Sequence, residues 1–245
     1  MSQRSTPPRP TPGFATTRWS LVVSLREGDD VRSREALEEL CRIYWAPVRA
    51  YVRRFTGREQ DADDLTQGLF ADLIERGDLG GARSERGRFR AWLLGCAKHW
   101  LLARRREDQA EKRGGGRAPL SLDDPRVEGL TPAAEAEAER RFEEDWALAL
   151  LADVQERLRR EEIVAGRVEA YELLRPRLGG GASSEGTYAE LAARLGTTEG
   201  ALRVATHRLR RRFGELLREA VGDTVADEDA VEEELARLRA ALARG

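Results

Sequence analysis

Residues 187–212 read TYAELAARLGTTEGALRVATHRLRRR, and this stretch decides what kind of fold the chain can form. Thr187 and Glu190 have the spacing of a capping box, in which each side chain bonds the other residue's backbone amide at the start of a helix. Gly196 stands where this first helix has to end and turn. A second helix then begins near Thr198. Two short helices joined by a tight turn predict a helix-turn-helix, whose second helix enters the major groove of DNA.

The second helix of this pair has two chemically different faces. We expect Leu202, Ala205 and Leu209 to form an apolar stripe that packs against the first helix. The other face is basic and polar, and its candidates for contact with DNA are Arg203, Thr206, His207, Arg210 and Arg211. An arginine at a guanine edge is worth about 1–3 kcal/mol of discrimination, whereas arginines on phosphate only position the helix. Nucleic acid is therefore the first functional hypothesis.

Charge is segregated along the chain. The 245 residues include 42 Lys or Arg and 44 Asp or Glu, so the net charge of −2 does not by itself indicate a nucleic-acid-binding protein. Residues 59–78, however, hold seven acidic residues against one arginine, and residues 203–218 hold six arginines against one glutamate. Separate acidic and basic segments indicate separate surfaces for separate partners.

Several classes of protein are disfavoured. Cys41 and Cys96 each fall on a predicted apolar helix face, which favours small buried side chains over a disulfide. With two histidines and no Cys-x-x-Cys pair, we expect no metal site and no cofactor. The chain shows no signal peptide and no apolar run that spans a bilayer. We therefore expect a cytoplasmic protein without membrane insertion.

The fold class is predicted to be all-α, because helical periodicity runs through most of the chain after residue 15 and β-branched residues are sparse. Outside 187–212 we expect helices at about 18–26, 33–55, 59–76, 88–106, 133–162, 164–175 and 227–243. Pro47 predicts a kink or break in the second of these helices.

These helices are expected to form two small domains joined by a flexible linker. The first domain covers 16–106 and the second 133–221, whereas the Pro-rich residues 1–15 are expected to be disordered. The linker at 107–132 carries three consecutive glycines and three prolines. An acidic extension at 222–245 is expected to form a helical tail.

The segment DADDLTQGLF at 61–70 allows three interpretations. An acidic helix surface binds a basic partner, chelates a metal or is simply solvated, and the solvated surface is the commonest case. The DDxxD arrangement of diphosphate-binding helical enzymes is absent, because the pair Asp63 and Asp64 is followed by Leu65, Thr66, Gln67 and Gly68. A metal-dependent helical enzyme is therefore an alternative, but the sequence has no second acidic motif to complete its metal site.

The segment GARSERGRFRAWLLGCAKHWLLARRR at 81–106 interleaves arginines with aromatic residues. This combination suits single-stranded nucleic acid, because arginines neutralise phosphates and aromatic rings stack on bases. The alternative is that Phe89, Trp92 and Trp100 belong to the core, which their helical spacing favours for most of them.

Taken in order, the DADDLTQ segment, the RFRAWL segment, the linker and YAELAARLG resemble an extracytoplasmic-function (ECF) sigma factor of the sigma-70 family over about residues 18–220. TRWSLV at 17–22, KRGGGRAPLSLD at 112–123 and DTVADEDAVEEEL at 223–235 are similar to a subgroup common in planctomycetes that carries a C-terminal extension. The resemblance implies a protein that is not an enzyme. It implies a subunit that binds core RNA polymerase and directs transcription initiation at promoter DNA.

The resemblance also implies three sets of site residues. In the first domain (region 2), the residues implied to bind the polymerase clamp are Asp61, Asp64, Leu65, Gln67 and Phe70. The loop 80–88 is expected to hold a flipped base of the −10 element, and the DNA-binding residues there are Arg83, Arg86, Arg88, Arg90 and Trp92. The second domain (region 4) is implied to read the −35 element through Arg203, Thr206, His207, Arg210 and Arg211.

Regulation and one other function stay open at this level. A helix-turn-helix transcription regulator with a helical sensing domain is the alternative, although it gives no reason for the acidic 61–75 surface. The tail either inhibits DNA binding by folding onto the other domains or completes the second domain's core. An anti-sigma factor or a regulatory kinase is a further possible partner, and Thr66 is among the hydroxyls expected to be exposed.

Overall fold

A computed structural model describes residues 30–57, 59–75, 88–112, 131–179, 186–225 and 230–243. The helices are α2 (Asp30–Thr56), α3 (Ala62–Glu75), α4 (Phe89–Lys112), α5 (Pro132–Val164), α6 (Val168–Leu174), the 3-10 turn η3 (Arg175–Arg177), α7 (Tyr188–Arg194), α8 (Glu199–Gly222) and α9 (Ala230–Leu242). No strand occurs in these ranges, and the all-α fold class is confirmed. The helix predicted at 18–26 and the disorder predicted at 1–15 lie outside the described residues.

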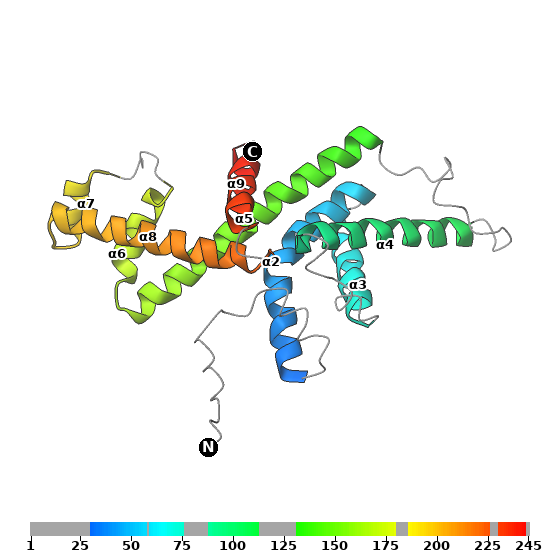
Figure 1. Cartoon of the computed structure of the whole chain (residues 1–245), viewed down its shortest axis with the longest axis horizontal. Helices are drawn as coiled ribbons and strands as arrows, with labels where there is room; N and C mark the ends of the chain where they lie inside the picture. The colour runs from blue at the N-terminus through cyan, green and yellow to red at the C-terminus, as the bar shows by residue number, and fades with distance from the viewer. Residues whose placement is uncertain are drawn as a thin grey trace, which may run out of the picture.

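Helices α2, α3 and α4 form one group around the predicted apolar stripe of α2. Tyr44, Val48 and Tyr51 are fully buried, and the Tyr44 ring meets the edge of Phe89 from α4 at 5.1 Å. Helix α2 continues through the buried Pro47 without a break, and it is bent along its length in Figure 1. The kink predicted at Pro47 is thus compatible with the structure, whereas a break is not.

Helix α5 runs through both groups of helices (Figure 1). Thr131 caps its first turn by accepting from the Ala134 amide at 3.3 Å. Its N-terminal half packs on α2, where the ring centroids of Phe142 and Tyr51 are 6.1 Å apart. Its C-terminal half packs on α6 and α8. The N-terminal half of α5, which the prediction placed in the second domain, therefore packs on the first group. Helical periodicity marked the apolar stripe of α5 but does not say which partner covers each part of it.

The linker predicted at 107–132 begins later than expected, because α4 continues to Lys112 rather than ending at Arg106. Its central part, residues 113–130, lies outside the described residues. In the described part of the chain no helix is long and apolar enough to cross a membrane.

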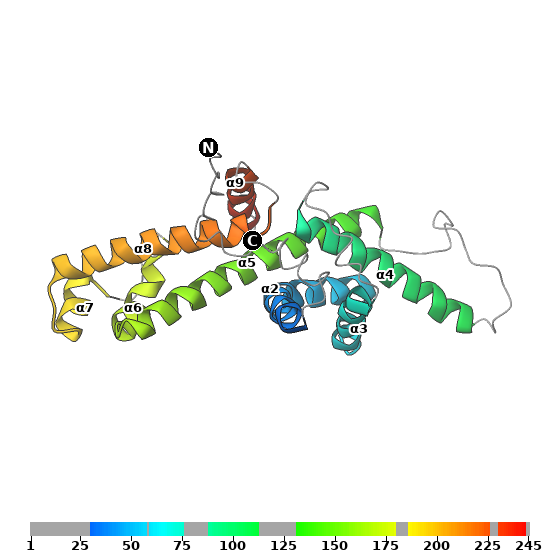
Figure 2. The same cartoon turned by 60° about the horizontal axis from the view of Figure 1, so that its bottom comes forward.

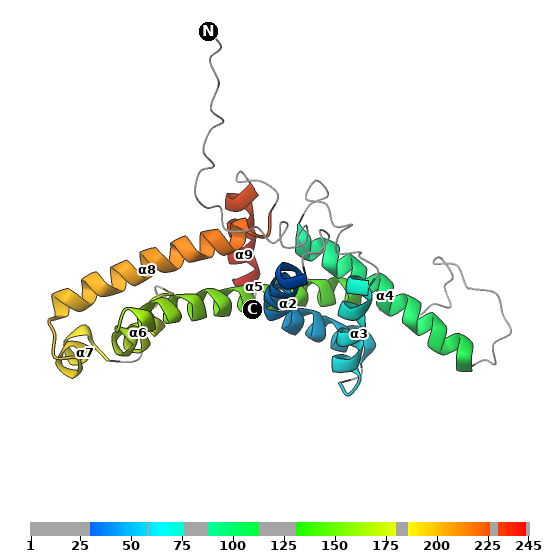
Figure 3. The ribbon, with the colours of Figure 1, turned by 90° about the horizontal axis from the view of Figure 1, so that it is seen from below.

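Helices α6, α7 and α8 form the second group. Helix α8 lies beside the C-terminal half of α5 in Figures 2 and 3, and it extends ten residues beyond the predicted end at Arg212. The guanidinium of Arg212 joins the two helices by donating to both carboxylate oxygens of Glu161 at 2.7 and 2.8 Å. The pairing lowers the pKa of Glu161 and raises that of Arg212.

Helix α9 crosses the junction between α5 and α8, as Figures 1 and 3 show. Val231, Leu238 and Ala241 are buried in this junction, and Leu235 is partly buried beside them. The predicted acidic tail is thus a packed helix whose apolar stripe is covered by the rest of the chain. An amphipathic helix buries its apolar face in any protein, so this packing does not by itself assign a role to α9.

Candidate functional site

The acidic surface of α3 contains most of the residues predicted to bind a polymerase. Asp64 and Gln67 are exposed, and Asp61 and Leu65 are half-buried at the beginning of the helix. The neighbouring Asp63 points elsewhere and accepts from Arg49 Nε of α2 at 2.5 Å, which lowers the pKa of its carboxyl group. Asp64 is therefore the exposed acid of this turn that Arg49 does not engage.

These acidic residues line one side of a cleft of about 390 Å³ between α2, α3 and α4. The lining residues are Phe55, Thr56, Asp61, Asp64, Leu65, Leu101, Arg104 and Arg105. The cleft offers carboxylates on one side, guanidinium groups on the other and apolar side chains between them. A partner with charges of both signs and an apolar contact fits such a surface better than a uniformly basic partner does.

Two side chains in α3 have structural roles that differ from the predictions. Phe70 was placed in the polymerase-binding set, but it is only 6% exposed and stacks on Trp45 of α2 at 5.7 Å. Thr66, expected to be an exposed hydroxyl for a kinase, is fully buried and donates to the Ala62 carbonyl at 2.6 Å. Both residues are buried, because they share the helical stripe of Leu69 and Leu73 rather than that of Asp64.

The acidic surface is also smaller than its sequence suggests. Asp72 was expected on the same exposed face, yet it accepts a hydrogen bond from Trp100 Nε1 of α4 at 2.7 Å. The indole of Trp100 lies against Gly68, where an added Cβ atom would be 3.2 Å from the ring. Trp100 is therefore a packing residue that fixes α4 on α3, as its helical spacing favoured.

The residues predicted to contact the −10 element differ in their exposure. Arg83 and Arg86 lie outside the described residues. Arg88 precedes α4 and keeps 29% of its side chain exposed. Trp92 is half-buried, and its ring is 5.5 Å from that of Phe89. Of the described arginines in this set, Arg88 is thus the one that is only partly buried, and it pairs with Glu234 of α9 at 2.9 Å.

Arg90 was predicted to bind DNA, but only 1% of the residue is exposed in this structure. Its Nε donates to Glu143 of α5 at 2.6 Å, and its guanidinium lies 4.2 Å over the ring of Trp146. Glu234 of α9 pairs with the same guanidinium. Burial lowers the pKa of Arg90, and the Glu143 carboxylate opposes that shift. In this conformation Arg90 is closed to DNA.

The local geometry of α7 and α8 follows the sequence closely. The Thr187 hydroxyl accepts from the Glu190 amide at 3.2 Å, and the Glu190 carboxylate accepts from the Thr187 amide at 2.6 Å. Gly196 has φ +62°, a left-handed conformation that a glycine adopts without a steric penalty. Thr198 caps α8 by accepting from the Ala201 amide at 3.2 Å. Both predicted helix starts and the turn between them are confirmed.

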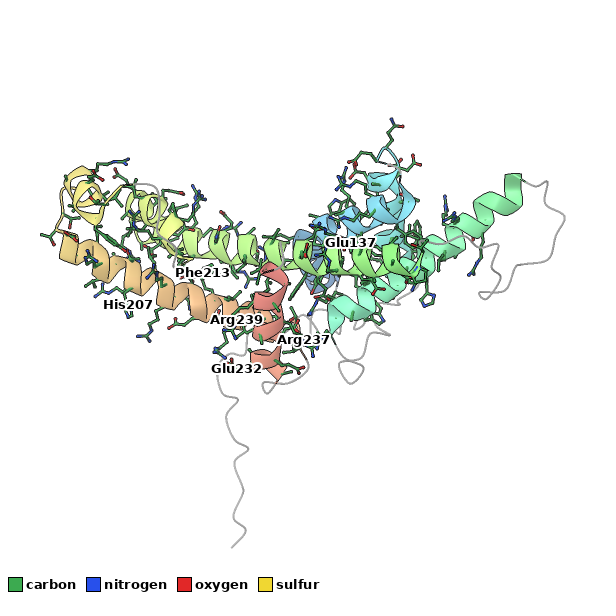
Figure 4. The ribbon with its side chains drawn as sticks, turned by 90° about the horizontal axis from the view of Figure 1, so that it is seen from above. Glu137, His207, Phe213, Glu232, Arg237 and Arg239 are labelled. Carbon is green, nitrogen blue, oxygen red and sulfur yellow. The ribbon has the colours of Figure 1, made fainter. Side chains whose placement is uncertain are left out.

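The exposed face of α8 carries Arg203, His207 and Arg211, which are spaced one turn apart. Arg203 lies 4.7 Å over the ring of Tyr188 and pairs with Glu199, and Arg211 pairs with Glu215 at 3.0 Å. Both are exposed pairs within one helix, which are worth about 0.3–0.5 kcal/mol. Such weak pairs leave these arginines available for exchange onto phosphates. His207 is labelled in Figure 4.

Two other members of the predicted α8 set bond to the protein itself, Thr206 as a buried residue and Arg210 as an exposed one. Thr206, predicted to contact DNA, is only 2% exposed and donates to the Leu202 carbonyl at 2.8 Å, so its side chain is turned toward the protein in this structure. Its Cα lies on the stripe of Leu202 and Leu209, one turn from each, and Ala205 is only half-buried at the edge of this stripe. Arg210 donates twice to the Arg177 carbonyl, at 3.1 and 2.7 Å, which anchors η3 to α8.

Sequence reasoning missed three features of these surfaces. The place of Arg104 and Arg105 on one side of the cleft was not predicted. Buried Arg177, which lies 5.1 Å over the Tyr188 ring, gave no signal in the sequence. The contact of Glu234 with α4 gave none either, because it joins segments far apart in the chain. Among the described residues, no group of three His, Cys, Asp or Glu side chains is placed to hold a metal ion.

Residues 40–111 match the family model for sigma-70 region 2. The matched segment contains α3, nearly all of α4 and the buried stripe of α2, so it includes the cleft described above. No curated protein and no solved structure matches the chain. The match supports a sigma factor of the sigma-70 family, and a region 2 domain implies binding to core RNA polymerase.

Proposed function

We propose that the protein is a sigma factor of the extracytoplasmic-function type, which binds core RNA polymerase and directs it to promoters. The observation that carries the proposal is the coincidence of the region 2 match with the cleft between α2, α3 and α4. In this proposal Asp61, Asp64 and Gln67 contact the polymerase clamp, with Leu65 as an apolar contact and Arg104 and Arg105 facing them. Catalysis then belongs to the polymerase.

The second part of the proposal concerns promoter recognition. We assign α7 and α8 to a region 4 helix-turn-helix that reads the −35 element, with Arg203, His207 and Arg211 toward the DNA. Their support is an exposed basic helix face that the capped turn at Thr198 holds in place. We assign the −10 element to the segment before α4, in which Arg88 is partly exposed. Phosphate contacts position such a protein and base contacts specify the sequence.

Transcription from a mixed template tests the proposal without a known promoter. Purified core RNA polymerase from the same organism is incubated with fragmented genomic DNA, with and without the protein, and the 5′ ends of the transcripts are sequenced. We expect new 5′ ends that share −10 and −35 sequences upstream, and co-elution of the protein with core polymerase. A protein that neither co-elutes nor adds 5′ ends is not a sigma factor. DNA binding without core binding would instead favour a helix-turn-helix regulator.

A further inference from the structure

The carboxylate of Glu234 is the centre of a buried ionic cluster that joins α9 to α4. Only 1% of this side chain is exposed. One of its oxygens lies 2.9 Å from Arg88 Nε, and the other contacts the Arg90 guanidinium. Glu143 and Trp146 of α5 hold Arg90 from the other side. The C-terminal helix thus places the Glu234 carboxylate on both Arg88 and Arg90, and the exposed carboxylate of Glu233 lies 4.0 Å from Arg88 as well.

Packing alone does not explain an acid at this position. Val231, Leu238 and Ala241 already attach α9 through apolar contacts, and a buried carboxylate costs free energy unless it is well paired. Such a pair is commonly no more stabilising than a well-packed apolar group of the same volume. The Glu234 carboxylate does one thing that an apolar side chain could not do. It occupies the position between Arg88 and Arg90 in which an anion binds.

A phosphate of DNA is an anion that arginine binds through the same charge-assisted hydrogen bonds as a carboxylate. Arg88 stands at the beginning of α4, directly after the loop that the proposed function assigns to the melted −10 strand. Helix α9 also packs on α8, which carries the other proposed DNA contacts. A single helix of the chain therefore contacts both elements that the proposed function gives to DNA.

We infer that Arg88 and Arg90 form an anion-binding site that takes either Glu234 of α9 or a phosphate of single-stranded DNA, so that α9 holds the site closed until it is displaced. The inference rests on the proposed function for the identity of the DNA strand. The single-stranded ligand follows from the basic and aromatic surroundings of the site, with Trp92 half-buried on the next turn.

The first test removes the anion while keeping the shape of its side chain. The full chain is titrated onto a fluorescein-labelled 20-nucleotide strand of mixed sequence, and fluorescence anisotropy gives Kd. We expect Glu234→Gln to lower Kd by about tenfold, which is the gain when an open state populated about one time in ten becomes the main state.

Glu232→Gln is the matched control. It removes the same charge from the same helix, on which Glu232 is labelled in Figure 4. Glu232 is exposed and pairs with Arg218 of α8 rather than with α4. We expect its Kd to stay within about twofold of wild type, because exposed ion pairs contribute little. Equal Kd values for Glu234→Gln, Glu232→Gln and the wild-type chain, with unchanged thermal unfolding, would overturn the inference.

A second measurement needs no variant and decides the matter if Glu234→Gln does not fold. Hydrogen exchange of the wild-type chain is followed with and without a saturating amount of the same strand. Displacement predicts faster exchange of the backbone amides in 230–242 and unchanged exchange in the buried part of α2. Binding of the strand without any loss of protection in α9 would contradict competition.

The result is separable from that of the proposed function. Competition between α9 and the strand, in a protein that does not bind core polymerase, would contradict the sigma assignment and leave this inference standing. Promoter-directed transcription, with Glu234→Gln equal to wild type in strand affinity, would contradict this inference alone.

Discussion

Arg54 Nη1 of α2 donates to the Asp145 carboxylate of α5 at 2.6 Å, across a separation of 91 positions in the sequence. Both side chains are more than half buried, and the contact of Tyr51 with Phe142 lies on the same two helices. Helix α5 therefore belongs to the core of the first group as much as to that of the second. The two predicted domains thus share one helix, α5, in the described residues.

The first prediction tests this shared helix. Phe142 is fully buried, so Phe142→Ala should lower the free energy of unfolding by about 3–5 kcal/mol, the usual cost of emptying an aromatic site in a core. Leu148→Ala on the same helix is the control, because Leu148 is 58% exposed and should change stability by less than about 1 kcal/mol. Urea denaturation followed by circular dichroism measures both. Equal losses, or a Phe142→Ala effect confined to one of two transitions, would contradict a shared core.

The second prediction concerns the contact between Gly68 and Trp100. Alanine is usually better than glycine inside a helix by about 1 kcal/mol. At Gly68, however, the new Cβ would lie 3.2 Å from the Trp100 ring, and the hydrogen bond to Asp72 limits how far that ring can move. Overpacking of this kind costs about 1–3 kcal/mol, so Gly68→Ala should lower the thermal midpoint. Gly214→Ala in α8, where no atom lies within 4 Å of the new Cβ, should raise it.

The third prediction separates the two faces of α8. Arg211→Ala should weaken binding to a 30-base-pair duplex of mixed sequence and reduce the slope of log Kd against log salt by about one, as the loss of a phosphate contact does. Thr206→Val should leave both quantities unchanged, because the Thr206 hydroxyl is buried on the Leu202 carbonyl. Fluorescence anisotropy at several salt concentrations gives the two slopes. A Thr206→Val loss equal to that of Arg211→Ala would place Thr206 on the DNA.

Local structure is where the sequence predicted most. The capping box at Thr187, the turn at Gly196 and the cap at Thr198 depend on residues within four positions of one another, and all three appear as expected. Assignment of side chains to faces was less secure. Thr206 looked polar and therefore exposed, but a threonine that bonds to the carbonyl four residues back fits a buried stripe.

Long-range pairing is where the sequence predicted least. The charges of Arg90 and Glu234 were both visible, yet nothing in their neighbourhoods identifies the partner. The same is true of Arg54 with Asp145. Amphipathic periodicity states that a helix has a face to bury and leaves the covering element undefined. Within the described residues, the positions of the helices were therefore predictable, but the packing of α5 on α2 was not.

The fourth prediction concerns the cleft beside α3. Reversing the charge of Asp61 and Asp64 together, with Asp61→Lys and Asp64→Lys, should weaken binding to core polymerase at least about tenfold, or about 1.4 kcal/mol, because positive charges would replace the two carboxylates proposed to contact the polymerase clamp. Glu75→Lys serves as the control, since Glu75 is exposed at the other end of α3. Biolayer interferometry with immobilised core measures the three affinities. Wild-type affinity in the double variant would remove the cleft from the polymerase interface.

The last prediction is a pH dependence at the contact of α5 with α8. Arg212 lowers the pKa of Glu161 below its ordinary value of about 4.3, so the folded chain binds that proton less readily than the unfolded chain does. The stabilisation by this pair is then complete above the unfolded pKa and disappears as the pH falls through the folded pKa. Wild type should exceed Glu161→Gln in stability at pH 7 and approach it toward pH 3. Because Glu161 is 41% exposed, 1 M salt should shrink the pH 7 difference, and a difference insensitive to both pH and salt would assign the effect to packing.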